Sequence, residues 1–321
     1  MPLLSVRRSA VPVAPIQPAA STPVSAARTG PREDPLRGIL LILAAVFFFS
    51  CSDAASKYLT ATLPAIQVTW LRFVAFIVIM LPAVLLLEGR AGLIAQQPGL
   101  QIVRALGVLG SAVLFVIGLG ELPMAEATTM AFVAPIFVTA LSIVFLGEYV
   151  GIRRWAAVIT GLVGVVIVVR PGIGAFDAAA LYPVLSALSW AVALVITRKT
   201  NADSPLTALT YAAVVGFVVL SVAVAFNWVS MGWREIFIGA VTGVTSTIAQ
   251  WLIVLAYRHA GASLLAPFFY SQLVWAAGLG FLIFGNVPDL WTLVGAAVII
   301  GSGLYTAHRE RIRAKEQSPT P

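Results

Sequence analysis

Apolar segments of about 20 residues recur along this chain from end to end, and they constrain its fold more than any other feature. A helix of that length crosses the hydrocarbon core of a bilayer, which is about 30 Å thick. The composition agrees, because 60% of the 321 residues are hydrophobic and only 10% are charged. An outer-membrane barrel would instead show short segments of alternating polarity. The sequence therefore predicts an all-α membrane protein with many transmembrane helices.

Ten transmembrane helices joined by short loops account for these segments. Pro64, Pro123, Pro205 and Pro288 stand at or beside helix starts, where a missing backbone N–H costs least. Two more prolines, Pro135 and Pro183, lie inside the fourth and sixth helices, and we expect them to loosen those helices. The predicted spans are 38–60, 64–87, 101–121, 123–147, 152–170, 178–197, 205–228, 235–257, 260–284 and 289–307.

The basic residues predict the orientation of the helices. If the N-terminus is cytoplasmic, most of the 20 Lys and Arg residues fall on the cytoplasmic side, and the outer loops hold only Arg170 and Arg234. Both termini are therefore expected in the cytoplasm of a multi-pass protein of the bacterial inner membrane. The same bias explains the net charge of +7 without nucleic acid as a partner.

The chain also repeats itself. The segment "LSIVFLGEYVGIRRWAAVITGLVG" at 141–164 is similar to "LGFLIFGNVPDLWTLVGAAVIIGSG" at 279–303, with Gly147 and Gly285 separated by 138 residues. Each repeat would hold five helices, and an odd number inserts the second repeat upside down, an architecture typical of secondary transporters. The predicted divisions are a disordered cytoplasmic tail over 1–36, a first repeat over 37–171, a second repeat over 172–307 and a cytoplasmic tail over 308–321.

Four charged residues lie within or near the ends of the predicted spans of the first repeat. The rise of a helix places Asp53, Lys57, Arg72 and Glu126 in the outer half of the bilayer, where they could share one layer. A charge at bilayer depth costs at least about 2.5 kcal/mol unless it is paired or faces water. Asp53 and Lys57 share one helix face at a favourable spacing. We expect that face to point into the bundle, toward a wet cavity.

A structural role for these charges remains an alternative. Asp53 and Lys57 could form a buried pair that sets helix register, or Lys57 could extend to the outer interface. Arg72 could be an internal clamp on Asp53 or Glu126 rather than a ligand of the substrate.

Aromatic and amide side chains take the place of charges in the second repeat. Trp190, Tyr270 and Gln272 fall near the bilayer midplane, with Trp275 one turn further on. Pro267 interrupts the helix close to Tyr270 and Gln272. Aromatic rings with a few amides suit a flat organic ligand, although single aromatic residues are also common as filler in membrane helices.

At these residues the sequence resembles the EamA-type, ten-helix branch of the drug/metabolite transporter superfamily. The resemblance covers roughly residues 37–307 and rests on "SDAASKYL", "VTWLRF", "LPMAEATTMAFVAPIFVTALSIVFLGEYVGIRRW", "AYRHAGASLLAPFFYSQLVWA" and "FGNVPDLWTLVGAAVIIGSGLY". It implies two inverted five-helix repeats around a central pocket with alternating access. The first and ninth helices look most like the riboflavin and S-adenosylmethionine uptake subgroup. Family members often carry Glu after the Gly in both repeats; Glu148 fits this pattern and Asn286 departs from it.

Our leading hypothesis is a carrier of a small organic metabolite, with riboflavin uptake as the first guess and S-adenosylmethionine uptake as the second. Export of amino acids or metabolites is compatible with the same fold. An intramembrane enzyme would need a catalytic constellation, but the two histidines lie at helix ends and Cys51 has no His nearby in the sequence. We therefore expect no enzyme, no cofactor and no metal. A homodimer is left open, as is coupling to a proton bound by Asp53 or Glu126.

Overall fold

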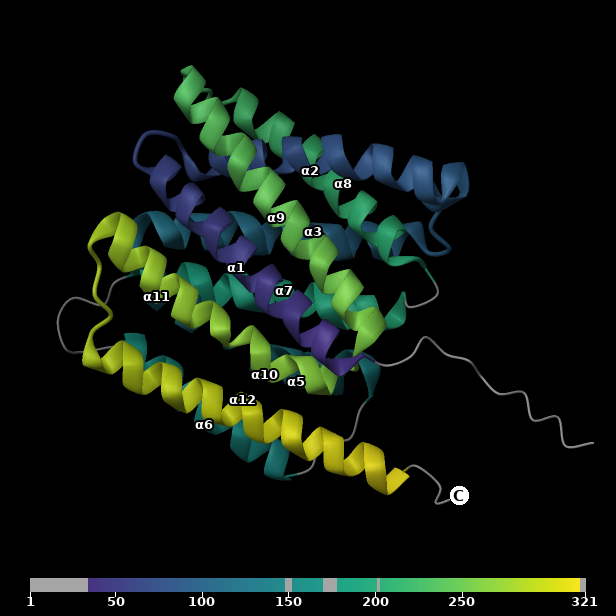
Figure 1. The fold of residues 1–321 in the computed structure, drawn as a ribbon, viewed down its shortest axis with the longest axis vertical. Coiled ribbons are helices and arrows are strands. Elements are labelled where there is room, and N and C mark those ends of the chain that lie inside the picture. Colours follow the sequence, from purple (N-terminus) through teal and green to yellow (C-terminus); the bar gives the residue numbers. More distant parts are fainter. Residues whose placement is uncertain (1–33, 148–151, 170–177, 201–202, 318–321) are drawn as a thin grey trace, which may run out of the picture. The chain divides into compact units, whose positions relative to one another are not determined.

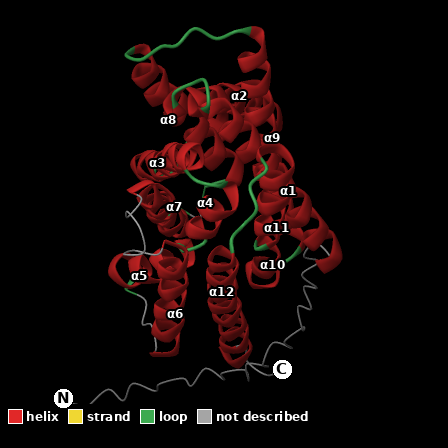
Figure 2. Ribbon diagram, turned by 90° about the vertical axis from the view of Figure 1, so that its left-hand side faces the viewer, coloured by secondary structure: helices red, strands yellow, loops and turns green. Residues whose placement is uncertain are grey.

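The computed structural model describes residues 34–147, 152–169, 178–200 and 203–317. Within these ranges the regular secondary structure is helical throughout (Figure 2). Eight described helical segments are long and apolar enough to cross a membrane, and two shorter apolar helices, Val158–Val169 and Leu290–Tyr305, accompany them. The chain is thus an all-helical integral membrane protein, as its composition predicts. Glu148, Arg170 and most of the predicted N-terminal tail lie outside the described residues.

The helices begin and end within a few residues of the predicted spans, except that the last one continues to Gln317. Pro64 and Pro123 precede α2 and α4, and Pro205 begins α8, so prolines mark helix starts as expected. The elements of the first half are α1 (Pro35–Thr60), α2 (Ala65–Leu87), the 3₁₀ helix η1 (Gly89–Leu93), α3 (Pro98–Glu121), α4 (Met124–Ala131), α5 (Ala134–Leu146) and α6 (Ile152–Val169). Those of the second half are the 3₁₀ helix η2 (Ala178–Ala180), α7 (Leu181–Lys199), α8 (Pro205–Ala225), α9 (Trp233–His259), α10 (Ala262–Phe269), α11 (Ser271–Phe284) and α12 (Leu290–Gln317).

Two of the predicted spans are broken in the middle. The fourth is divided into α4 and α5 just before Pro135, which has no N–H to offer the carbonyl of Ala131. The ninth is divided into α10 and α11 at Tyr270, three residues after Pro267. The expectation for Pro183 was wrong, because this proline lies in the first turn of α7, where it interrupts no helical hydrogen bond.

Gly147 and Gly285 end α5 and α11 in the same way. Their φ values are 65° and 70°, in the left-handed region that glycine adopts at no steric cost. After Gly285, the N–H of Asn286 donates to the carbonyl of Gly280 at 3.1 Å, which closes the end of the helix. The glycines that reveal the sequence repeat are therefore helix caps, and the backbone of Asn286 belongs to the second cap.

The long helices lie side by side in pairs. α1 packs along α9, α3 along α7, α2 along α8 and α6 along α12. The α2–α8 pair and the α6–α12 pair lie at opposite ends of the described bundle (Figures 1 and 2). Glycines allow the closest approaches: a Cβ atom on Gly164 would stand 3.0 Å from the carbonyl oxygen of Gly295 on α12.

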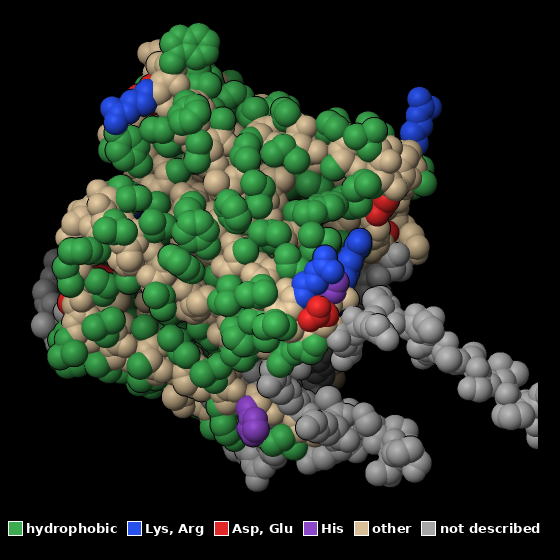
Figure 3. All heavy atoms as spheres, viewed as in Figure 1, with side chains coloured by type: hydrophobic (Ala, Val, Ile, Leu, Met, Phe, Trp, Pro, Cys, Tyr) green, Lys and Arg blue, Asp and Glu red, His purple; other side chains and the backbone are tan. Residues whose placement is uncertain are grey.

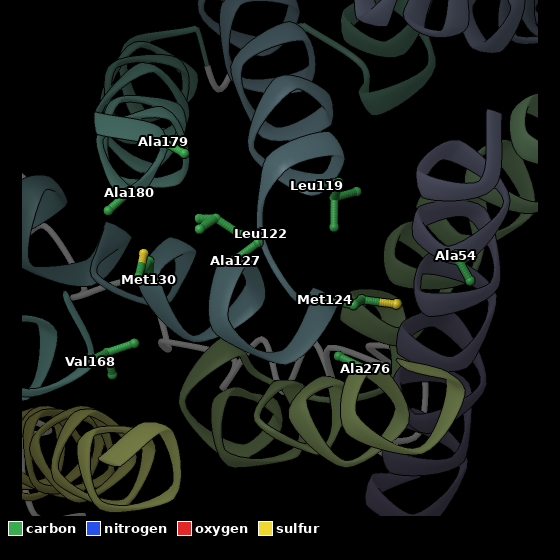
Figure 4. Packing of buried hydrophobic residues seen from close by; sticks show 10 residues of the cluster. All are labelled: Ala54, Leu119, Leu122, Met124, Ala127, Met130, Val168, Ala179, Ala180 and Ala276. Atoms are coloured by element: carbon green, nitrogen blue, oxygen red, sulfur yellow. The ribbon is translucent and has the colours of Figure 1, made fainter. Parts of the chain in front are cut away.

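A core of apolar side chains fixes α4 among its neighbours. Met124, Ala127 and Met130 of α4 are buried against side chains of α1, α3, α6, η2 and α11 (Figure 4). The outer face is also apolar: in Figure 3 hydrophobic side chains cover most of the visible surface, and charged side chains gather near its margins. Such a surface is suited to contact with lipid. The core around α4 keeps α1 and α11 next to each other, and these two helices carry the polar residues of the candidate site.

Candidate functional site

Three polar side chains from three helices meet inside the bundle. Asp53 of α1 forms an ion pair with Arg72 of α2, with 3.9 Å between Oδ1 and Nη1. The Nε2 atom of Gln272, on α11, donates to Oδ2 of the same carboxylate at 3.3 Å. The residue Asp53 is only 3% exposed, and the side chain of Arg72 is 14% exposed. We call Asp53, Arg72 and Gln272 the polar cluster.

The helix sequences explain why the cluster forms. Ser52, next to Asp53 in the sequence, donates to the carbonyl of Thr242 on α9 at 2.9 Å, so this face of α1 is held against α9. The guanidinium of Arg72 also lies over the ring of Phe49, 6.0 Å from its centroid. Gln272 is the second residue of α11, just after the break at Tyr270, and its amide reaches Asp53 of α1.

Lys57 does not pair with Asp53, although the spacing of the two residues on α1 suggests that it would. In the described contacts, the ion-pair partner of Asp53 is Arg72, and the ammonium of Lys57 donates to the carbonyls of Leu119 and Leu122 at 2.6 and 2.7 Å. These carbonyls lie at the C-terminal end of α3, where helices leave acceptors without partners. The ammonium is also 5.5 Å from the ring centroid of Phe284 at the end of α11. Lys57 thus joins the ends of α1, α3 and α11.

Glu126 and Trp190 lie on two other helices, α4 and α7. Glu126 is half-buried in the first turn of α4, where a carboxylate is favoured by the helix dipole. Trp190, on α7, is 39% exposed. The described contacts of the polar cluster include neither residue.

Tyr270 faces a different side of the broken helix from Gln272. Its ring contacts that of Phe132, with centroids 5.0 Å apart, and Phe132 ends α4 at the other helix break. A small cavity lies beside this contact, lined by Phe132, Tyr270 and residues of α5, α6 and α12. The hydroxyl of Tyr270 lies so close to Gly303 that a Cβ atom at that position would overlap with it. The two helix breaks are therefore in direct contact through an aromatic pair.

Trp275 lies one turn beyond Gln272 on α11. Its indole contacts the ring of Phe47 of α1 edge-on, with centroids 4.8 Å apart, and the residue remains 40% exposed. An aromatic pair thus lies one turn from the polar cluster on α11.

Sequence reasoning missed the polar contacts that join both ends of α2 to the residues flanking α8. At one end of α2, Gln67 exchanges two hydrogen bonds with the backbone of Val229, at 2.7 and 3.0 Å. At the other end, the hydroxyl of Ser204 donates to Glu88 at 2.7 Å. A signal was present in the sequence, since Gln67 is an amide within an apolar segment, but its partner is 162 residues away. These contacts hold the α2–α8 pair together at both ends.

The cluster can offer charge and hydrogen bonds without a metal. Among the described residues, no group of three or more His, Cys, Asp or Glu side chains could hold a metal ion. What the geometry provides is one cation, one anion and one amide, desolvated together inside a helical bundle.

The amino-acid sequence is similar to those of several known proteins. The model of the EamA-like transporter family matches the chain twice, over residues 36–170 and 177–306. The S-adenosylmethionine uptake transporter of Rickettsia bellii is 31% identical over 275 residues, covering 85% of this chain and 94% of that protein. The riboflavin transporter of Vibrio cholerae is 29% identical, covering 89% and 98%. The pseudopaline exporter of Pseudomonas aeruginosa is 29% identical, covering 82% and 93%.

A solved structure shares the fold. One crystal structure matches with a TM-score of 0.62 at 18% identity, covering 85% of this chain and 98% of the other.

Proposed function

The chain belongs to the EamA-like transporter family, and we propose that it carries a small organic metabolite across the bacterial inner membrane by alternating access. The observation that carries this proposal is the polar cluster. Intramembrane charges that face the interior of a helical bundle commonly mark a substrate or ion pathway. The polar cluster provides such charges in a chain whose family transports solutes.

We propose ten membrane spans arranged as two inverted repeats, over 37–171 and 172–307. Several features support this arrangement. The family model matches twice, and Phe132 and Tyr270, at the two helix breaks, are separated by the same 138 residues as the caps Gly147 and Gly285. Packing is also reciprocal, since α1 of the first half lies along α9 and α7 of the second half lies along α3. The distribution of Lys and Arg supports cytoplasmic termini.

The two broken helices support alternating access. Discontinuous helices surround the substrate site in many transporters with inverted repeats, because their free backbone groups bind ligands and their breaks allow bending. Here the breaks meet at Phe132 and Tyr270, and the α10–α11 break lies between the polar cluster and the adjoining cavity. Bending at these breaks would change the access to Asp53 and Arg72 from either side.

The substrate we propose is a flat heteroaromatic metabolite. Asp53, Arg72 and Gln272 would bind its polar groups, and the exposed indole of Trp275 would stack against its ring. Lys57, which joins the ends of three helices, and Tyr270 would act in gating, while Glu126 and Trp190 are further candidates for the pathway. Relatives named for S-adenosylmethionine and for riboflavin are almost equally similar, so both compounds are candidates.

Export is the second candidate function. The pseudopaline exporter is similar to this chain over 93% of its length, and alternating access runs in either direction according to the gradients. The same pathway would then serve the opposite flux.

Flux into proteoliposomes tests the proposal. Purified protein is reconstituted and the entry of labelled riboflavin or labelled S-adenosylmethionine is measured beside liposomes without protein. Saturable entry of one compound is the expected result. No entry and no counterflow of either compound, with protein inserted in the bilayer at normal amounts, would overturn the proposed substrate class.

A further inference from the structure

The ion pair at the centre of the polar cluster is loosely made. Its closest approach, 3.9 Å, is longer than a hydrogen bond between a guanidinium and a carboxylate, which is about 2.7–2.9 Å. The amide of Gln272 is also distant from Asp53, at 3.3 Å. Both ions are nevertheless withdrawn from solvent. Each ion therefore has unused capacity for a stronger partner.

A ligand that brings both charges can satisfy this capacity. A carboxylate from a ligand could bind the guanidinium of Arg72 through two parallel hydrogen bonds, and an ammonium could bind the carboxylate of Asp53. One loose ion pair would become two close ones, and the net charge of the buried site would stay unchanged. A ligand that is neutral at the same place would separate the two ions without offering either a counter-charge, which is costly in a buried site.

We propose that Asp53 and Arg72 form the receptor for the zwitterionic head group of an α-amino acid, with the ligand's ammonium on Asp53 and its carboxylate on Arg72. This proposal rests on the proposed function and narrows its substrate class. The geometry suits the head group because the two ions lie side by side, as the ammonium and carboxylate do on an α-carbon. Gln272 completes the site with an amide that can donate to the ligand's carboxylate once Asp53 turns toward the ammonium.

The rest of the ligand would lie toward α11. Trp275 is one turn from Gln272 and keeps 40% of its surface exposed, so a ring attached to the head group can stack on it. S-adenosylmethionine has the α-amino-acid head and a flat purine, and its sulfonium adds one positive charge outside the head group. Riboflavin is uncharged at neutral pH and has no group that replaces either ion. The polar cluster therefore favours S-adenosylmethionine over riboflavin.

Competition on the unaltered protein is the first test. Uptake of labelled S-adenosylmethionine into proteoliposomes is measured with S-adenosylhomocysteine, which keeps the amino-acid head, or with 5′-methylthioadenosine, which lacks it. Inhibition by S-adenosylhomocysteine at concentrations that leave 5′-methylthioadenosine without effect is the expected result. Equal inhibition by the two compounds would overturn the proposal, because the head group would then contribute nothing to binding.

Removal of both charges at once is the second test. The double variant Asp53→Asn, Arg72→Gln leaves neither ion of this pair without its partner, so a pair that is only structural should tolerate it. We expect kcat/KM for S-adenosylmethionine to fall at least about 30-fold, since two charged contacts with the ligand are lost. The matched control is Arg90→Gln, an exposed residue of η1, which should transport normally. Normal transport by the double variant would overturn the proposal.

The outcomes separate this inference from the proposed function. If the unaltered protein carries riboflavin and not S-adenosylmethionine, the proposed function stands and the head-group receptor is refuted. If it carries neither compound, the proposed function fails as well. If the double variant does not reach the membrane, the competition experiment decides the matter without it.

Discussion

Breaking the ion pair between Asp53 and Arg72 from one side should destabilise the protein far more than removing both charges. The pair is 3.9 Å apart. At the effective dielectric constant of about 20 that describes protein sites, two unit charges at this distance attract by about 4 kcal/mol. Either single variant, Asp53→Asn or Arg72→Gln, loses this attraction and leaves one charge buried without its partner, which costs about 3–5 kcal/mol.

A double-mutant cycle measures this coupling. The free energy of unfolding of the purified protein in detergent is determined for the unaltered chain, both single variants and the double variant. We expect the double variant to be more stable than either single variant, with a coupling energy of a few kcal/mol. Arg90→Gln, on an exposed side chain of η1 outside the polar cluster, should combine additively with Asp53→Asn. Additive losses in the Asp53–Arg72 cycle would refute the view that these two charges stabilise each other.

The structure makes three further predictions. Gly303→Ala should reduce the rate of transport, because its Cβ atom would overlap with the hydroxyl of Tyr270; adding Tyr270→Phe should restore part of the rate in the same flux assay. Lys57→Ala should abolish transport at an unchanged amount of protein in the membrane, because the last carbonyls of α3 lose their donor; uptake normalised to immunoblot signal checks this, and normal uptake would contradict it. Gly285→Ala should lower the unfolding free energy by about 1–2 kcal/mol, because alanine is strained at a φ of 70°. Thermal unfolding measures this loss, with Gly301→Ala as the control, since a Cβ atom on that helical glycine would meet no atom of a neighbouring element within 4 Å.

The positions of the helices could be predicted because insertion into a membrane depends mainly on the length and apolar character of a segment. Long apolar stretches identify the helices, and prolines mark where they begin or break. Pro135 and Pro267 also pointed to the two interrupted helices. Pro183 misled because a proline's effect depends on its position in the helix, and the first turn of α7 begins only two residues before it.

The partners of the charged residues could not be predicted in the same way. Spacing on one helix suggested that Asp53 faces Lys57, and the sequence also allowed Arg72 as a clamp on either Asp53 or Glu126 without deciding between them. The structure pairs Asp53 with Arg72 and with Gln272, a residue 219 positions away. The ammonium of Lys57 donates to carbonyl oxygens at the end of α3. Every residue has a backbone carbonyl, so the sequence does not indicate which ones will act as partners. Selecting Arg72 and Gln272 as candidates was feasible because both are costly in an apolar helix. Bringing them together required the packing of three helices.

Ligand-dependent stability tests the central claim most directly, because it reports binding without regard to the direction of transport. The thermal unfolding of the purified protein is followed with and without S-adenosylmethionine, for the unaltered chain and for the variant Asp53→Asn, Arg72→Gln. A ligand at about 100 times its dissociation constant stabilises the folded protein by about 2.7 kcal/mol. We predict that S-adenosylmethionine stabilises the unaltered chain and leaves the double variant unchanged. Equal stabilisation of both proteins would show that the ligand binds elsewhere and would contradict the role of Asp53 and Arg72.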